Sequence, residues 1–121
     1  MKTILCVDDS STVLLSLTAI LNKAGYVADK ALSGDEGLSK LTGGYKPDLI
    51  ITDLNMPGMN GIEFIKHVRQ LPALRFVPIL FLTTESQQTK RAEAKAAGAS
   101  GWLVKPVNGD ELLNTIKLVV R

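Results

Sequence analysis

Features that mark several specialised protein classes are absent from this sequence or scarce in it. Cys6 is the one cysteine among 121 residues, so an internal disulfide is excluded. Long apolar runs are also lacking. The run at 4–7, close behind Met1-Lys2, is too short for a signal-peptide core or a membrane span. Because no lipidation motif is present either, we expect a cytoplasmic protein with no membrane segment.

Charge of one sign is not in large excess. The 14 basic residues are scattered among 12 acidic ones, and the net charge of +2 without a basic run argues against binding nucleic acid. Hydrophobic residues make up 45% of the chain, an ordinary globular balance, and the length suits one domain over residues 1–121. Cys6 lies inside an apolar run, so we expect a buried core thiol rather than a reactive one.

Short apolar runs alternate with longer helical patterns five times along the chain. Several of these runs, such as Leu49-Ile50-Ile51, are continuous rather than alternating, as in strands that are buried on both faces of a parallel sheet. The pattern therefore predicts an α/β fold, a doubly wound five-stranded parallel sheet with right-handed crossovers. The predicted strands are 2–7, 27–31, 48–53, 78–83 and 101–104.

Helical spacing of apolar residues predicts the segments between these strands. The predicted helices are 10–24, 35–41, 61–71, 86–97 and 108–120, and Asn108 is the expected N-cap of the last. Helix 86–97 contains no Leu, Ile, Val, Phe or Met. We expect Ala92, Ala96 and Ala97, with Ala94, to face the sheet, and alanine buries so little area that this helix should be weakly anchored.

Polar residues stand at the carboxyl ends of four of the five predicted strands. Asp8-Asp9 follows the first strand, Asp53 ends the third, Thr83-Thr84 ends the fourth and Lys105-Pro106 follows the last. Ligands of open α/β sheets bind outside this edge. We therefore expect these side chains to form one site.

The chemistry of that group favours a divalent cation. Two like charges about 4 Å apart repel by roughly 4 kcal/mol at an effective dielectric constant of 20. Lys105 offsets only one of the three negative charges, and oxygen ligands favour Mg²⁺. There is no Cys/His cluster, which argues against zinc. One carboxylate at such a site would be able to act as a nucleophile and become an aspartyl-phosphate.

In order and spacing, these residues resemble the receiver domains of two-component response regulators. The loop 53–61 resembles that family too, and the match extends over essentially the whole chain. The resemblance implies a (βα)₅, flavodoxin-like and CheY-like fold with strand order 2-1-3-4-5. It implies Asp53 as the phospho-acceptor, with Lys105 paired to the phosphoryl oxygens and Thr83 hydrogen-bonded to the phosphoryl group.

The resemblance also assigns a metal site and a switch. Asp9, Asp53 and the backbone carbonyl of Asn55 would ligate Mg²⁺ directly, and Asp8 would help to hold the ion through water. Trp102 occupies the place of the family's switch aromatic, which is usually Tyr or Phe. The Lys105-Pro106 peptide bond would be cis.

The partner implied by the family is a sensor histidine kinase, which donates the phosphoryl group to a regulator that is not itself an enzyme. Asn55 and Glu85 form the pair found in chemotaxis regulators and would tune the lifetime of the phosphoryl group. This favours a monomer that binds a flagellar motor or chemotaxis protein through an output face around Trp102. Two alternatives stay open: a receiver fragment of a larger transcriptional or enzymatic regulator, and a sink for phosphoryl groups.

Two other classes fit the sequence poorly. A phosphatase of the haloacid dehalogenase type needs a second carboxylate two residues after its nucleophile, where this chain has the amide Asn55. A flavin- or nucleotide-binding module needs a phosphate loop after the first strand, where Asp8-Asp9 would repel phosphate. His67 is the single histidine, and we expect it to face solvent without a role in the site.

Overall fold

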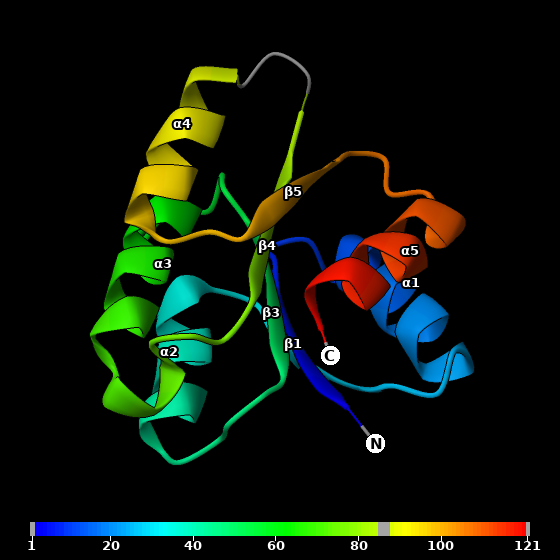
Figure 1. Cartoon of the computed structure of the whole chain (residues 1–121), viewed down its shortest axis with the longest axis horizontal. Helices are drawn as coiled ribbons and strands as arrows, with labels where there is room; N and C mark the ends of the chain where they lie inside the picture. Colours follow the sequence, from blue (N-terminus) through cyan, green and yellow to red (C-terminus); the bar gives the residue numbers. More distant parts are fainter. Residues whose placement is uncertain (1, 85–87, 121) are drawn as a thin grey trace.

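A five-stranded parallel sheet forms the middle of the molecule. The computed structural model describes residues 2–84 and 88–120, and its strands lie in the order β2-β1-β3-β4-β5 (Figure 1). Both the parallel sheet and the strand order are as predicted. The strands are β1 (Thr3–Val7), β2 (Val27–Ala31), β3 (Leu49–Asp53), β4 (Ile79–Thr83) and β5 (Gly101–Val104).

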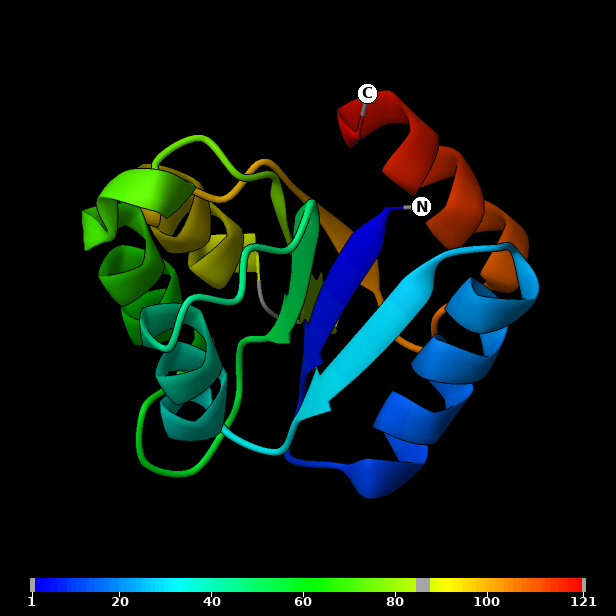
Figure 2. The same ribbon diagram turned by 90° about the horizontal axis from the view of Figure 1, so that it is seen from below.

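Helices cover both faces of the sheet. α1 and α5 pack on one face, and α2, α3 and α4 pack on the other (Figures 1 and 2). A short 3-10 helix, η1 (Pro72–Leu74), was not predicted. The α-helices are α1 (Ser11–Lys23), α2 (Gly34–Thr42), α3 (Gly61–Gln70), α4 (Gln88–Ala97) and α5 (Gly109–Val119).

Each central strand supplies residues to two separate hydrophobic cores. In β1, Ile4 and Cys6 pack under α1 and α5, whereas Leu5 and Val7 pack under α2 and α3. All four are fully buried. This explains why the apolar runs of the sequence are continuous, because every position along such a strand faces a helical layer.

Polar side chains begin several of the helices. Ser10, Ser33, Asn60 and Asn108 each accept a hydrogen bond from a backbone N–H three residues on, at the starts of α1, α2, α3 and α5. The predicted N-cap at Asn108 is thus confirmed. Such caps satisfy amides that have no partner inside the helix, and they explain where these helices start.

The prediction for the face of α4 is wrong in part. Ala94 is buried and Ala97 half-buried, but Ala92 and Ala96 are exposed. The less exposed stripe instead runs through Arg91, Ala94 and Ala97, at a spacing of three residues. Reading only apolar residues missed Arg91, whose long side chain can lie across apolar surface while it keeps its charge.

Two smaller predictions are confirmed. Cys6 is fully buried, and burial raises the pKa of its thiol to about 12, with a smaller contribution from Asp29. His67 is exposed on α3. Of the helices that the structure describes, none has the length and apolar character needed to cross a lipid bilayer.

Candidate functional site

Neighbouring strands in the middle of the sheet position the first carboxylates. β1 ends at Val7 and is followed by Asp8, while β3 ends at Asp53. Val7 is paired with Thr52 in the parallel register. The next residues, Asp8 just past β1 and Asp53 at the end of β3, therefore lie beside each other.

Asp8, Asp9, Asp53 and Lys105 meet at this edge of the sheet. One carboxylate oxygen from each of the three aspartates lies within 4.8 Å of the others, with Asp8 and Asp53 buried and Asp9 exposed. Lys105 Nζ lies 3.3 Å from Asp8 Oδ2 and 3.3 Å from Asp53 Oδ1. The structure thus brings together four of the predicted site residues, with one cation against three anions.

Backbone amides hold the two buried carboxylates. The N–H of Ser10 donates to Asp8 Oδ1 at 2.9 Å, and that of Asn55 donates to Asp53 Oδ1 at 3.4 Å. Asp8 Oδ2 is buried and accepts no hydrogen bond within the part of the chain that the structure describes, and it faces Lys105 Nζ in an ion pair. A buried anionic oxygen in this state is costly, and a cation bound beside it would lower that cost.

The same crowding shifts the ionisation of the site. Burial raises the pKa of the Asp53 carboxyl above its ordinary value, and Asp8 raises it further, while Lys105 and the N–H of Asn55 offset only part of the rise. Burial alone would lower the pKa of Lys105, but the attraction of Asp53 and Asp8 outweighs it and the pKa is raised. Lys105 therefore remains a cation at neutral pH, beside a carboxylate whose charge the fold disfavours.

The loop after Asp53 is fixed by a glycine at its far end. The N–H of Gly61 donates to the carbonyl oxygen of Leu54 at 2.9 Å, and a Cβ at position 61 would overlap the carbonyl oxygen of Asp53. Next to it, Asn60 and Glu63 form a capping box at the start of α3. Sequence reasoning assigned no role to Gly61, although its place directly after an N-cap asparagine was an available signal.

Thr83 ends the strand beside the carboxylates. It is 1% exposed, and its hydroxyl donates to the carbonyl oxygen of Thr84 at 3.1 Å. In the sheet Thr83 is paired with Val104, the residue before Lys105. Of the two threonines that the strand end offered, the buried one is therefore Thr83, whereas Thr84 is exposed.

Trp102 lies in β5 and is 47% exposed. Its ring centroid is 6.3 Å from that of Phe81, and the guanidinium carbon of Arg91 lies 5.0 Å from the Trp102 ring centroid. The predicted switch aromatic thus contacts α4 and β4.

The Lys105-Pro106 bond is cis, as the resemblance implies. Glu85, the other predicted tuning residue, lies outside the described residues.

Comparisons with known proteins agree with this geometry. The model of the response regulator receiver domain matches residues 4–117. Protein PilH of Pseudomonas aeruginosa is 38% identical over 120 residues, which cover 99% of this chain and 98% of PilH. The phosphate regulon transcriptional regulatory protein PhoB of Rhizobium meliloti is 34% identical over 115 residues, but these cover 95% of this chain and only 50% of PhoB.

Solved structures give the same result along the whole chain. The chemotaxis protein CheY4 of Vibrio cholerae superposes with a TM-score of 0.94 at 45% identity, and the match covers 99% of each chain. The predicted CheY-like fold is therefore confirmed by a neighbour of the same length as well as by the strand order.

Proposed function

We propose that Asp53 accepts a phosphoryl group from a histidine kinase, on the premise that this chain belongs to the receiver-domain family of two-component response regulators. The observation that carries the proposal is the position of Lys105 Nζ, 3.3 Å from Asp53 and from Asp8 at the same edge of the sheet. A lysine at this place would pair with phosphoryl oxygens once Asp53 is modified. A purely structural ion pair would not need two carboxylates on one lysine and a third carboxylate beside them.

The proposed reaction is a transfer between a kinase histidine and Asp53. A carboxylate oxygen of Asp53 attacks phosphorus and forms the new O–P bond, while the P–N bond to the donor imidazole breaks and its electron pair leaves with that imidazole. The amide of Asn55 and the lysine hold the carboxylate, which limits the orientations from which it can attack. Because the phosphoryl group would carry about −1.5 to −2 charges where the free carboxylate carries −1, Lys105 would bind the product more strongly than the free carboxylate.

The donor set fits Mg²⁺. Asp8, Asp9 and Asp53 would hold the ion together with the backbone carbonyl of Asn55, since carboxylate and carbonyl oxygens are its preferred ligands. The buried oxygen of Asp8 without a hydrogen bond supports this assignment. When bound, the ion would supply positive charge that neutralises the carboxylates and the incoming phosphoryl oxygens.

The proposed output runs through Thr83 and Trp102. Thr83 would turn its hydroxyl to the phosphoryl group, and Trp102 would move into the space that this change leaves. The half-exposed ring of Trp102 and its contact with Arg91 support this, because a change there alters the surface of α4 and β5 together. A protein partner that binds this surface would then distinguish the two states.

We place the pathway in chemotaxis, with a chemotaxis or flagellar motor protein as the partner, a cytoplasmic location and a monomeric state. The likeness of the whole chain to chemotaxis protein CheY4 supports this. Asn55 and Glu85 would set the lifetime of the phosphoryl group. The match to half of PhoB favours the alternative, a receiver that forms part of a longer regulator, and a phosphoryl sink would use the same site.

The test is phosphorylation by acetyl phosphate with Mg²⁺, followed by the intact mass of the protein. We expect one phosphoryl adduct that depends on Mg²⁺, is lost in Asp53→Asn and is retained in Asp35→Asn, a change at an exposed carboxylate of α2. Fluorescence of Trp102, the single tryptophan, should change with the adduct. A folded wild-type protein that binds Mg²⁺ but gains no mass would refute the proposed acceptor.

A further inference from the structure

The outer edge of β2 carries backbone donors that would be free to pair with another strand. Val27 donates its N–H to the carbonyl of Lys2, next to β1. Alternate residues of a parallel strand face the same neighbour, so the amides of Ala28 and Lys30, and that of Leu32 just past the end of β2, point away from β1. An edge of this kind is a template for strand addition, and stable proteins usually obstruct it.

Each of these three outward amides is occupied by a side chain. Asn22 Oδ1 accepts from Ala28 N–H at 3.3 Å, and Asp29 Oδ1 accepts from Lys30 N–H at 2.8 Å. Leu32 N–H donates to an oxygen of Glu36 at 3.1 Å. The three acceptors come from α1, from β2 itself and from α2.

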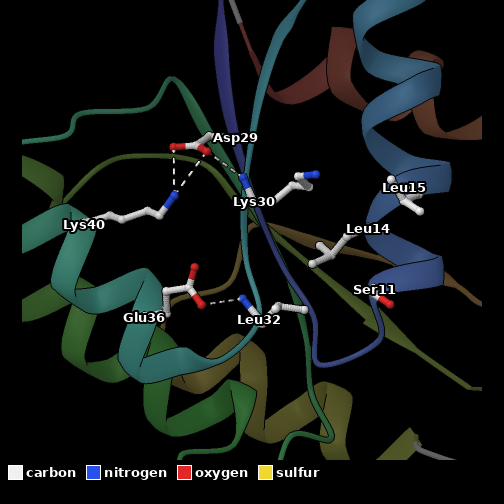
Figure 3. A pocket seen from close by; sticks show the side chains of 8 residues that line it. All are labelled: Ser11, Leu14, Leu15, Asp29, Lys30, Leu32, Glu36 and Lys40. Atoms are coloured by element: carbon white, nitrogen blue, oxygen red, sulfur yellow. Dashed lines mark hydrogen bonds and ion pairs between the residues drawn. The ribbon is translucent and has the colours of Figure 1, made fainter.

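A second contact holds the middle acceptor in position. Lys40 Nζ lies 3.2 Å from both carboxylate oxygens of Asp29, and Figure 3 shows this pair near the hydrogen bond that the Leu32 N–H donates to Glu36. α2 therefore contributes both an acceptor for the edge and a cation that restrains another acceptor. Nothing in the proposed phosphoryl chemistry requires this arrangement.

Exposed apolar side chains lie along this edge, among charged ones. Leu15, Val27 and Leu32 are 61%, 44% and 50% exposed. Leu15 and Leu32 line a hollow of about 360 Å³ between α1 and α2 (Figure 3). Apolar side chains beside unpaired backbone groups are the combination that promotes pairing of edge strands.

We propose that Asn22, Asp29 and Glu36 close the edge of β2 against strand addition, and that their removal would make this edge an interface for a second copy of the chain. The occupant is a second copy because β2 can pair with β2 of an identical chain around a two-fold axis, which presents the same edge twice. In the wild-type protein the three side chains satisfy the donors that such pairing would need.

The test compares the mass in solution of two variants of equal charge. One combines Asn22→Ala, Asp29→Ala and Glu36→Ala. The control combines Glu93→Ala, Asp110→Ala and Asn114→Ala, all exposed and away from β2. Sedimentation over a range of concentrations should shift the first variant from the mass of one chain towards that of two, while the control stays with the wild type.

Two further variants keep the test decisive. The double variant Asn22→Ala, Glu36→Ala retains the Asp29–Lys40 pair and should associate as well, though less, even if the triple variant fails to fold. Adding Ala28→Pro to either removes an outward N–H and should restore the mass of one chain. The proposal is wrong if the triple and the double variant both keep the mass of one chain at every concentration at which the wild type does. It is also wrong if Ala28→Pro does not reverse their association.

Discussion

α3 and α4 lie side by side on the same face of the sheet, yet they are anchored in different ways (Figure 1). α3 buries four large apolar side chains, whereas the only buried side chain of α4 among the described residues is that of Ala94. The buried apolar residues of α3 are Ile62, Phe64, Ile65 and Val68. The core thus holds the helix that follows Asp53 through four large side chains, whereas the helix that follows Thr83 contributes Ala94 and the half-buried Ala97 to it.

α4 is held instead by contacts near its end and along its side. Arg69 of α3 donates to the carbonyl oxygen of Gly98 through Nε at 3.1 Å and Nη2 at 2.7 Å. Arg91 lies over the ring of Trp102. Polar and cation–π contacts can be exchanged without opening a cavity, so this side of the molecule can change shape at lower cost than the α3 side.

The largest expected effect is in the core beneath α3. Phe64→Ala should lower the free energy of unfolding by about 3–5 kcal/mol, because it leaves a cavity where a fully buried ring packs. Urea unfolding measures this. Phe76→Ala is the matched control, since the Phe76 side chain is 89% exposed and should cost less than about 0.5 kcal/mol. Equal costs would mean that the core under α3 is not close-packed.

The contact between the two helices should come next. Arg69→Ala should cost about 2 kcal/mol, because it removes charge-assisted bonds to Gly98 and to the carbonyl oxygen of Leu74. Burial lowers the pKa of Arg69 below its ordinary value but leaves it a cation. Lys66→Ala, an exposed change on the same helix, is the control. Urea unfolding should separate the two variants. If Arg69→Ala lowers the free energy of unfolding no more than Lys66→Ala does, the contact of Arg69 with Gly98 does not anchor α4.

A smaller effect, a gain rather than a loss of stability, is expected at the acidic site that contains Asp53. Burial of the Asp53 carboxylate and the charge of Asp8 both disfavour its ionised form and raise its pKa, and the attraction of Lys105 offsets only part of this. Asp53→Asn should therefore stabilise the metal-free protein by about 1 kcal/mol at neutral pH.

The pH dependence of this gain has a definite sign. Since the folded-state pKa of Asp53 is raised, the wild-type protein is relatively most stable below the ordinary pKa and loses that advantage as pH rises through the raised value. Urea unfolding should show a gain for Asp53→Asn that is small at acidic pH and grows towards neutrality. Mg²⁺ should reverse it, since it binds the carboxylates of the folded wild type. If the gain for Asp53→Asn does not vary with pH, the raised pKa of Asp53 is not its cause.

The sequence predicted this fold and the grouping of its site residues because both depend on strand ends. Apolar runs locate buried strands, and parallel order places Asp8, Asp53 and Lys105 on one edge whatever the side-chain details. The rotation of α4 was not predictable in the same way. The rotation of α4 depends on where Arg91 lies. The spacing of apolar residues does not reveal a charged residue that is half-buried on a helix. The close approach of Gly61 to the backbone of Asp53 likewise exists only in three dimensions.

The smallest change should reveal whether α4 opens independently of α3. Ala94→Gly removes the buried methyl group of α4 and lowers helix propensity by about 1 kcal/mol. The change should lower the global free energy of unfolding by about 1 kcal/mol and accelerate hydrogen exchange about fivefold wherever exchange requires α4 to open. If α4 opens by itself, its amides should exchange with a lower opening free energy than those of α3, in the wild type and in the variant. Ala92→Gly, at an exposed position, controls for propensity alone and should accelerate exchange less. Equal opening free energies in α3 and α4 would mean that the two helices open together, so that the weak packing of α4 does not make it a separate element of the switch.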